Sequence, residues 1–311
     1  MSAPLHSQTK CTMLEQQLLN GLITGSVYAL FALGFTLVFS VHRILNLAHG
    51  AVFMVGAFIA YYAVLSGVPL WLATLMAASF AGFASVVVQF VSIQRLRRYP
   101  HHIVEFAALV TTLGVDLVLV STMQRLSSAQ TVRFPFGSFP IMFFNFLGLR
   151  ISLLQIVIVL TVATLLAFLI FYLYATTVGR QVRAVASNPR ASLLLGVNPS
   201  FVYMQTFFIS GVMAGVAGVL ISLSFNSIDA HMGEPYMLRA FVIIVLGGLG
   251  SIPGCVIAAL LFGVGQTLCI AYLPPGSPDI VIYSVLFLVL LIKPSGLMGQ
   301  EAVAAGLGRR A

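Results

Sequence analysis

Long apolar runs separated by short polar connections dominate this chain and restrict what it can fold into. About 20 apolar residues are needed to cross a bilayer as a helix. The sequence is 60% hydrophobic and 7% charged, whereas soluble domains carry about 25% charged residues. It therefore predicts an all-α polytopic membrane bundle of about eight or nine transmembrane helices, which excludes most soluble enzymes. The runs cover residues 18–39, 47–65, 70–91, 106–123, 153–175, 201–224, 238–252, 254–273 and 280–292.

The polar segments are too short to form a second domain. We expect an N-terminal tail at 1–17, one transmembrane domain at 18–300 and a C-terminal tail at 301–311. The first apolar run is long enough to stay in the membrane rather than act as a cleaved signal. The connection 124–152 is rich in aromatic residues. It is expected either to lie at the membrane interface or to form an ordinary re-entering loop.

Basic residues in the loops predict the orientation of the chain. One side would carry ten of them and the other side four, so the first side is expected in the cytoplasm together with the C-terminus. The formal net charge of +8 is dispersed over these loops and does not indicate nucleic-acid binding. The first set is Arg43, Arg95, Arg97, Arg98, Arg180, Arg183, Arg190, Lys293, Arg309 and Arg310, and the second is Lys10, Arg125, Arg133 and Arg150.

The connection 176–200 contains clear helix boundary signals. Asn188 is a suitable N-cap, Pro189 suits the first helical position and Gly196 suits a left-handed stop. These signals predict a helix of about two turns over Pro189–Leu195. A short helix of fixed shape is suited to docking with a partner. A plain amphipathic linker at the lipid headgroups is the alternative.

A second interruption, at 247–254, combines glycines and a proline within apolar surroundings. Backbone irregularity at membrane depth survives only where protein or a water-filled cavity satisfies its polar groups. The predicted topology favours a tight turn between two helices at the cytoplasmic face. A gating role in the substrate path is the less favoured alternative.

Polar residues within apolar runs are the candidates for a transport path. Asn46 and His49 share one helix face, where they either face a cavity or form a cap and an interhelical hydrogen bond. Asp116 lies in the middle of an apolar run, and is expected to be protonated, paired with His49 or placed in the cavity. Thr112 either bonds the backbone or faces substrate.

Other patterns favour structural roles. Gly211 and Gly215 form a small-residue pattern typical of helix packing. Cys255 and Cys269 stand too far apart on one helix for a disulfide, so we expect free thiols and no metal site.

The chain lacks the residues for ATP hydrolysis, and a secondary carrier or an intramembrane enzyme is less favoured than an ATP-driven transporter. A phosphate-binding loop needs Gly-Lys-Ser/Thr, and neither lysine, Lys10 or Lys293, follows a glycine. ATP-driven transport would therefore need a separate ATPase. A secondary carrier would need intramembrane acids, for which Asp116 is the only good candidate. An intramembrane enzyme would need a nucleophile with a base, or metal ligands at helical spacing, and neither His-Glu-x-x-His nor Gly-x-Ser-x-Gly occurs.

Three motifs resemble the permeases of ABC importers, and most closely those for branched-chain amino acids. The resemblance covers residues 18–300, and similar permeases transport urea and short amides. The first motif, similar to the ATPase-coupling loop, comprises Gly179, Arg180, Arg183, Ala184, Val185 and Ala186, then Ala191 and Gly196. Arg190 in the same loop is a further candidate for contact with the ATPase. The others are Asn46-Leu47-Ala48-His49-Gly50 with Gly56-Ala57, and Gly247-Gly248-Leu249-Gly250-Ser251-Ile252-Pro253-Gly254.

This resemblance implies a bacterial inner-membrane subunit with several partners. They are a second permease chain in a heterodimer, two cytoplasmic subunits that hold ATP and Mg²⁺, and a periplasmic binding protein. The outer loop with Asp229, His231 and Glu234 would face that binding protein or simply be solvated. Ala51 replaces a common acidic residue, and a carboxylate is common near Arg190. We find no charged constellation for an amino-acid zwitterion inside the path, whose candidates are Asn46, His49, Thr112, Asp116, Gly247, Gly248 and Gly250.

Overall fold

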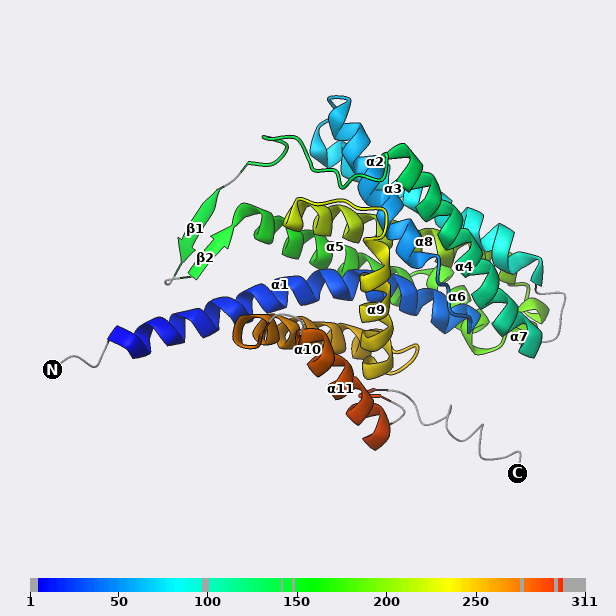
Figure 1. Cartoon of the computed structure of the whole chain (residues 1–311). Helices are drawn as coiled ribbons and strands as arrows, with labels where there is room; N and C mark the ends of the chain where they lie inside the picture. The colour runs from blue at the N-terminus through cyan, green and yellow to red at the C-terminus, as the bar shows by residue number, and fades with distance from the viewer. Residues whose placement is uncertain are drawn as a thin grey trace.

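A computed structural model describes residues 5–96, 101–140, 142–146, 149–274, 277–293 and 296–298. The chain is a mainly helical bundle (Figure 1), as predicted. Each of the nine apolar runs forms a helix: α1 (Leu5–His42), α2 (His49–Leu65), α3 (Leu70–Val88), α4 (His101–Leu126), α5 (Leu153–Ala175), α8 (Pro199–Phe225), α9 (Gly233–Gly247), α10 (Ile252–Tyr272) and α11 (Ser277–Ile292). The remaining elements are a π-helix, η1 (Gln89–Gln94), the short helices α6 (Thr177–Ser187) and α7 (Pro189–Leu194), and the strands β1 (Phe143–Phe146) and β2 (Leu149–Ser152).

The helices differ in their capacity to cross a membrane. Among the described residues, six are long and apolar enough to cross: those within α1, α3 with η1, α4, α5, α8 and α10. The apolar helices α2, α9 and α11 have only 17, 15 and 16 residues. The membrane bundle is therefore confirmed, while the expected count of eight or nine full spans stays a prediction.

Close glycine contacts hold the centre of the bundle together. α8 is largely buried between α2 and α3, and a Cβ on Gly211 would come within 2.5 Å of the Ala81 carbonyl oxygen on α3. The backbone of Gly218 packs directly against the Phe53 carbonyl on α2. The packing role predicted for the small-residue pattern of Gly211 and Gly215 is confirmed, because both positions admit no side chain without displacing a neighbouring helix.

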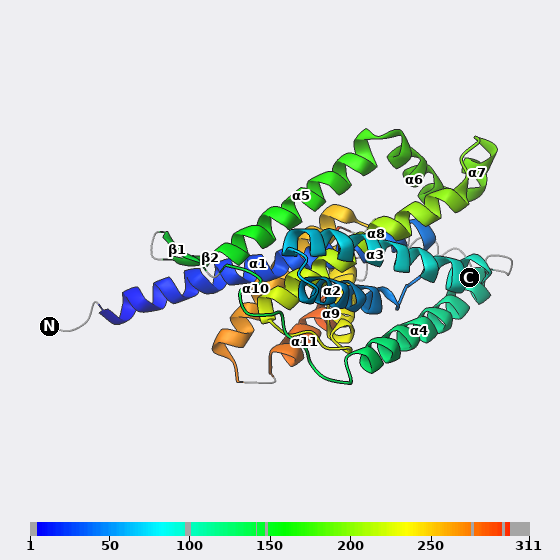
Figure 2. The ribbon, with the colours of Figure 1, turned by 90° about the horizontal axis from the view of Figure 1, so that it is seen from above.

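The connection between α4 and α5 contains a strand pair that the sequence did not predict, while its placement at the membrane interface stays a prediction. β1 and β2 form an antiparallel hairpin in which Phe143 pairs with Ser152, so a small strand pair stands in an otherwise helical protein. The Arg150 N–H donates to the Gln16 side chain over 2.9 Å, which ties the hairpin to the first part of α1. The hairpin lies at the N-terminal end of the bundle, and α6 and α7 lie at the opposite end (Figures 1 and 2).

Some of the predicted features fall outside the described residues. These are Arg97, Arg98, Arg309, Arg310 and the tail at 301–311. Cys255 and Cys269 are free thiols, as predicted, and the Cys255 sulfur accepts a hydrogen bond from the Thr36 hydroxyl on α1.

Candidate functional site

α2 begins in the middle of the bundle rather than at its end. The His49 Nε2 atom lies 3.1 Å from the Phe31 carbonyl oxygen on α1, and its Nδ1 atom lies 3.4 Å from the Ser210 hydroxyl on α8. Phe31 is close to the middle of the apolar part of α1, Met13–His42. His49 is fully buried, so the structure supports its interhelical hydrogen bonds rather than exposure to a cavity.

α9 begins at the same level as α2. The first residue of α9, Gly233, packs directly against Gly50, and a Cβ on Gly50 would come within 3.0 Å of the Gly233 carbonyl oxygen. Before α9, residues 226–232 turn back alongside α8, and α9 then runs across the direction of α1 (Figure 1), so that Figure 2 views it nearly end-on. We call this meeting of two helix starts, around Gly50 and Gly233, the mid-depth junction.

Acidic side chains gather beside the mid-depth junction. The Asp116 carboxylate on α4 faces the backbone of Ala51 in the first turn of α2, where the helix dipole favours negative charge. His231 and Glu234, just before and at the start of α9, share a 2.7 Å hydrogen bond. Of the three alternatives for Asp116, the pairing with His49 is not formed, because both ring nitrogens of His49 have other partners.

The extended segment before α2 brings further polar groups to this level. Thr112 is buried and bonded to the backbone, donating to the Ala108 carbonyl over 2.8 Å and accepting from the Leu47 N–H over 3.2 Å. Asn46 is 1% exposed, and within the described part of the chain neither polar atom of its amide has a hydrogen-bond partner. Asn46 therefore fits the requirements of a path residue better than Thr112 or His49.

The π-helix η1 adds buried polar groups that the sequence reasoning missed. Gln89 and Ser92 are buried. The side-chain amide oxygen of Gln89 and the hydroxyl of Ser92 lack hydrogen-bond partners among the described residues. The Thr111 hydroxyl on α4 lies 3.2 Å from the Ser92 carbonyl oxygen, so η1 contacts the same stretch of α4 as the segment before α2. π-helical turns often occur at functional sites, and this one is visible in the structure rather than in the sequence pattern.

One charged residue at the junction was also overlooked in the sequence. Arg239 lies on α9, and its guanidinium donates to the Tyr28 hydroxyl on α1 over 3.2 Å. The same guanidinium lies over the Tyr236 ring, 5.3 Å from the ring centroid. Arg239 is the second residue of the apolar run 238–252. The turning back of residues 226–232 brings that run into the centre of the bundle.

The glycine-rich segment 247–254 is a tight turn, as favoured from the sequence. α9 ends at Gly247, Gly248 and Gly250 adopt φ values of 99° and 86°, and Ser251 caps α10. These positive φ values explain why glycine is needed at both positions. The N–H groups of Leu297 and Met298 donate to the Leu246 and Gly247 carbonyls, so a segment after α11 completes the end of α9.

The predicted helix in the α6–α7 loop (residues 176–200) is confirmed almost residue for residue. α7 spans Pro189–Leu194, and the Asn188 side chain accepts from the N–H groups of Arg190 and Ala191. Gly196 has φ 81°. The exposed fractions of Leu193, Leu194 and Leu195 are 61, 89 and 82%, so the loop presents an apolar tip on a helix that is capped at its start.

α6 was not expected from the sequence, and it anchors this loop to α5. The Arg183 guanidinium donates to the Leu173 carbonyl and lies over the Tyr174 ring, so it caps the end of α5. Gly179 packs against the carbonyls of Tyr172 and Leu173, where no larger residue fits. Of the candidate residues in the loop, Gly179 is buried, Ala184 is partly buried, and Arg180, Arg183, Arg190, Ala191 and Gly196 are exposed. Gly179 through its packing and Arg183 through its hydrogen bond position the loop, and the other exposed residues remain available for contact.

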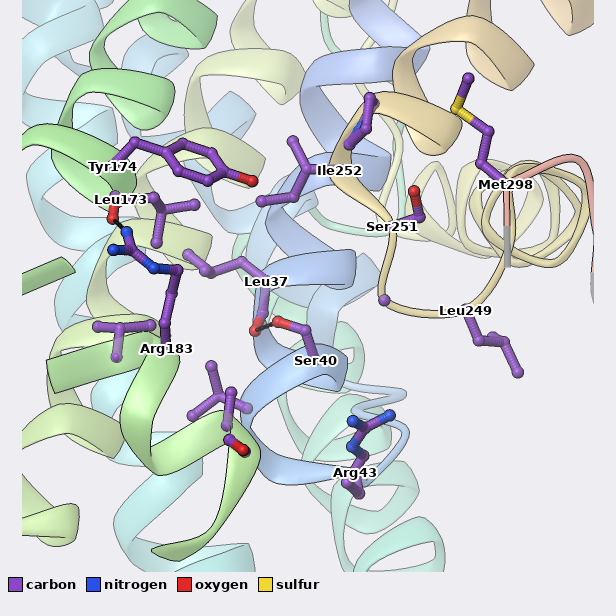
Figure 3. A pocket seen from close by; sticks show the side chains of 16 residues that line it. Leu37, Ser40, Arg43, Leu173, Tyr174, Arg183, Leu249, Ser251, Ile252 and Met298 are labelled. Carbon is purple, nitrogen blue, oxygen red and sulfur yellow. Dashed lines mark hydrogen bonds between the residues drawn. The ribbon is translucent and has the colours of Figure 1, made fainter. Parts of the chain in front are cut away.

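A cavity separates the α6–α7 loop from the glycine turn (Figure 3). Its volume is about 550 Å³, and its lining includes Ser40 and Arg43 at the end of α1, Arg183 on α6, and Ser251. Arg43 and Arg183 stand on opposite sides of it. Because the cavity is lined by both the loop and the turn, a movement of α6 would change its shape directly.

Metal ligation is not supported by the described part of the chain. No group of three or more His, Cys, Asp or Glu residues there could hold a metal ion. His231 and Glu234 instead bond to each other.

Two helices that start at mid-depth, and a capped loop with an apolar tip at one end of the bundle, together define a class of protein. Interrupted helices of this kind line substrate paths in transporters, so the chain is a multi-pass membrane transport permease. It belongs to the family described as "Branched-chain amino acid transport system / permease component", whose match covers residues 17–292.

Curated relatives from bacteria and archaea support this assignment. The chain is 33% identical over 297 residues to "High-affinity branched-chain amino acid transport system permease protein LivH" of Escherichia coli (strain K12), covering 93% of this chain and 96% of the relative. It is 32% identical over 300 residues to permease protein BraD of Pseudomonas aeruginosa, with the same coverage. A probable LivH of Methanocaldococcus jannaschii is 26% identical over 303 residues, covering 92 and 93%.

Proposed function

We propose that this chain is the transmembrane permease of an ATP-driven ABC importer for branched-chain amino acids. The names of the relatives support this substrate class over urea or short amides. The chain itself would catalyse no reaction. Its partners would be a second permease, two cytoplasmic ATPase subunits with their ATP and Mg²⁺, and a periplasmic binding protein, in a bacterial inner membrane with the C-terminus in the cytoplasm.

The observation that carries this proposal is the exposed tip of the α6–α7 loop. Three leucines stand in solvent on a helix whose start is capped by Asn188, while Arg183 fixes the preceding helix to α5. A rigid apolar tip lowers the entropic cost of docking into a partner. Because the chain has no phosphate-binding loop, the partner that docks there is the ATPase.

Movement of the loop would reach the path through contacts already in place. α6 lines the cavity that the glycine turn also lines, and that turn ends α9. The other end of α9 lies at the mid-depth junction, so closure of the ATPases would tilt or shift α9 at the level where α2 begins. The unpartnered amide of Asn46 supports a path there, because a buried amide without partners is costly and gains a partner when water or solute enters.

An ion-coupled carrier is the less supported alternative. It would need an intramembrane acid that binds and releases the coupling ion. The Asp116 carboxylate instead faces the first turn of α2, where it has a structural role.

Crosslinking tests the coupling assignment directly. Cysteine at Leu194 should crosslink to the ATPase subunit in the assembled complex, whereas cysteine at Leu160, an exposed residue in the apolar body of α5, should not. Both variants are made in a chain whose native cysteines are replaced, and uptake is measured to show that the complex works. A transporting complex in which the Leu194 position captures no nucleotide-hydrolysing subunit would refute the assignment.

A further inference from the structure

An arginine side chain lies at the centre of the bundle. Arg239 hydrogen-bonds to Tyr28, which is at the middle of the apolar part of α1, Met13–His42. The Tyr28 ring packs edge-on against Phe262, the middle residue of α10. Since α1 and α10 both qualify as membrane-crossing helices, the guanidinium is held at mid-depth, where an unpaired charge is costly.

The charge on Arg239 is not neutralised within the described residues. No carboxylate there lies within ion-pair distance of it, and its partners are the Tyr28 hydroxyl and the rings of Tyr28 and Tyr236. Aromatic faces attract a guanidinium but do not cancel its charge. Arg239 is only partly buried, so an anion can reach the donors that the tyrosines leave unused.

The geometry of a guanidinium favours a planar anion with two oxygens. Its parallel N–H groups match a carboxylate in a two-pronged hydrogen bond. An α-amino acid brings such a carboxylate, together with an ammonium group.

Apolar groups at the junction match the rest of such a solute. Phe53 packs against Tyr236 with ring centroids 5.1 Å apart, and Tyr236 packs edge-on against Tyr28 at 5.8 Å. This aromatic cluster adjoins the Arg239 guanidinium. Of these rings only Tyr236 is partly exposed, since Phe53 and Tyr28 are buried. A hydrocarbon side chain would therefore contact the Tyr236 ring while its carboxylate contacts the arginine.

We propose that Arg239 binds the α-carboxylate of the transported amino acid as it passes the mid-depth junction. The inference rests on the proposed function and adds a selectivity element within the permease itself. It departs from the sequence-based expectation that the path holds no charged constellation for a zwitterion. Urea and simple amides lack a carboxylate and would gain nothing from this site.

Uptake by the whole complex in proteoliposomes tests the proposal. Leucine is delivered by the loaded binding protein in every case, so differences between variants arise in the permease. We expect Arg239→Gln to lower the uptake rate roughly tenfold to hundredfold, as for loss of a charge-assisted hydrogen bond, and Arg239→Lys to lower it less. Leu238→Gln, a polar change at the exposed neighbour on α9, is the matched control and should stay close to wild type.

A charge-specific rescue separates binding from a structural role. Arg239→Cys in a chain lacking other cysteines should regain uptake after modification with a cationic aminoethyl thiosulfonate. A neutral methyl reagent should not restore it. Loaded binding protein should slow the modification during turnover, and empty binding protein should not. Leu238→Cys should show neither effect.

The outcomes are distinguishable from failure of the proposed function. A wild-type complex that imports leucine without ATP would remove the importer assignment, whatever Arg239 does. With ATP-driven import established, three results would each overturn the carboxylate site. These are uptake by Arg239→Gln within twofold of wild type, rescue by neutral and cationic reagents alike, and failure of Arg239→Gln to assemble with the second permease, which would indicate a permanent ion pair between subunits.

Discussion

The mid-depth junction and the α6–α7 loop are built in opposite ways. At the junction, backbones touch through glycines, and the side chain of His49 is enclosed between three helices. In the loop, a capped helix projects from the bundle and its leucines remain exposed. The comparison teaches that the junction depends on long-range packing, whereas the loop depends on local hydrogen bonds. A substitution that disrupts packing in the centre of the bundle should therefore abolish folding. A substitution in the loop should abolish only the coupling to the ATPase.

The largest expected effect comes from adding volume at the centre. Gly218→Val would force a branched side chain against the Phe53 carbonyl, so α2 and α8 must separate. Overpacking of this kind costs about 3 kcal/mol. We expect a much lower yield of folded protein in membranes and a lower thermal unfolding temperature in detergent.

Gly114→Val is the matched control for that change. It makes the same substitution within α4, where nothing lies within 4 Å of the added Cβ. Equal losses from the two variants would contradict a special role for packing between α2 and α8.

A charge on the loop tip should have a large effect on transport and little effect on folding. Leu194→Asp places a carboxylate at a side chain that is 89% exposed. Loss of a central apolar contact at an interface costs about 2 kcal/mol, or roughly thirtyfold in affinity. Uptake should fall accordingly while the unfolding temperature stays unchanged.

Leu194→Met keeps the apolar contact and should transport normally. If Leu194→Asp lowered the unfolding temperature as much as Gly218→Val, the proposed contrast between the two regions would be wrong.

Removing the helix cap should have a moderate effect on the loop. Asn188→Ala deletes the acceptor for the N–H groups of Arg190 and Ala191, at a cost of about 1 kcal/mol. Hydrogen exchange at those two amides should become roughly fivefold faster, and uptake should fall modestly. Asn188→Asp keeps an acceptor and should restore both, so equal exchange in all three proteins would contradict the capping role.

The smallest effects are expected at the end of the loop. Gly196 has φ 81° and open space around it, so only backbone strain opposes a side chain there. Gly196→Asn should be nearly neutral because asparagine tolerates this conformation, and Gly196→Val should cost about 1 kcal/mol. Uptake measured over a temperature series compares the two, and a valine variant as stable as the asparagine variant would contradict the strain argument.

The same contrast explains which features were predictable from sequence. Asn188, Pro189 and Gly196 act on their own neighbours, so their pattern predicted α7 almost to the residue. The turn at Gly248 and Gly250 was predictable for the same reason. The site at the junction was not, because it depends on contacts between residues far apart in the chain.

Arg239 illustrates what sequence patterns miss. It follows a polar segment that was expected to stay outside the membrane. Its position near the start of an apolar run did not indicate how deep in the membrane it lies. Its depth becomes clear only from the hydrogen bond to Tyr28. The β1–β2 hairpin was missed for a different reason, because no turn signal was recognised between its two strands.

The hydrogen bonds from Leu297 and Met298 to the end of α9 have a consequence for biosynthesis. Leu297 and Met298 leave the ribosome after all the apolar helices that precede them in the chain. Their N–H groups nevertheless complete the end of α9, the helix that carries Arg239. The nascent permease therefore reaches the translocon exit with this element unfinished. Premature termination before Leu297 should yield a product that inserts but is recognised as incomplete by membrane proteases.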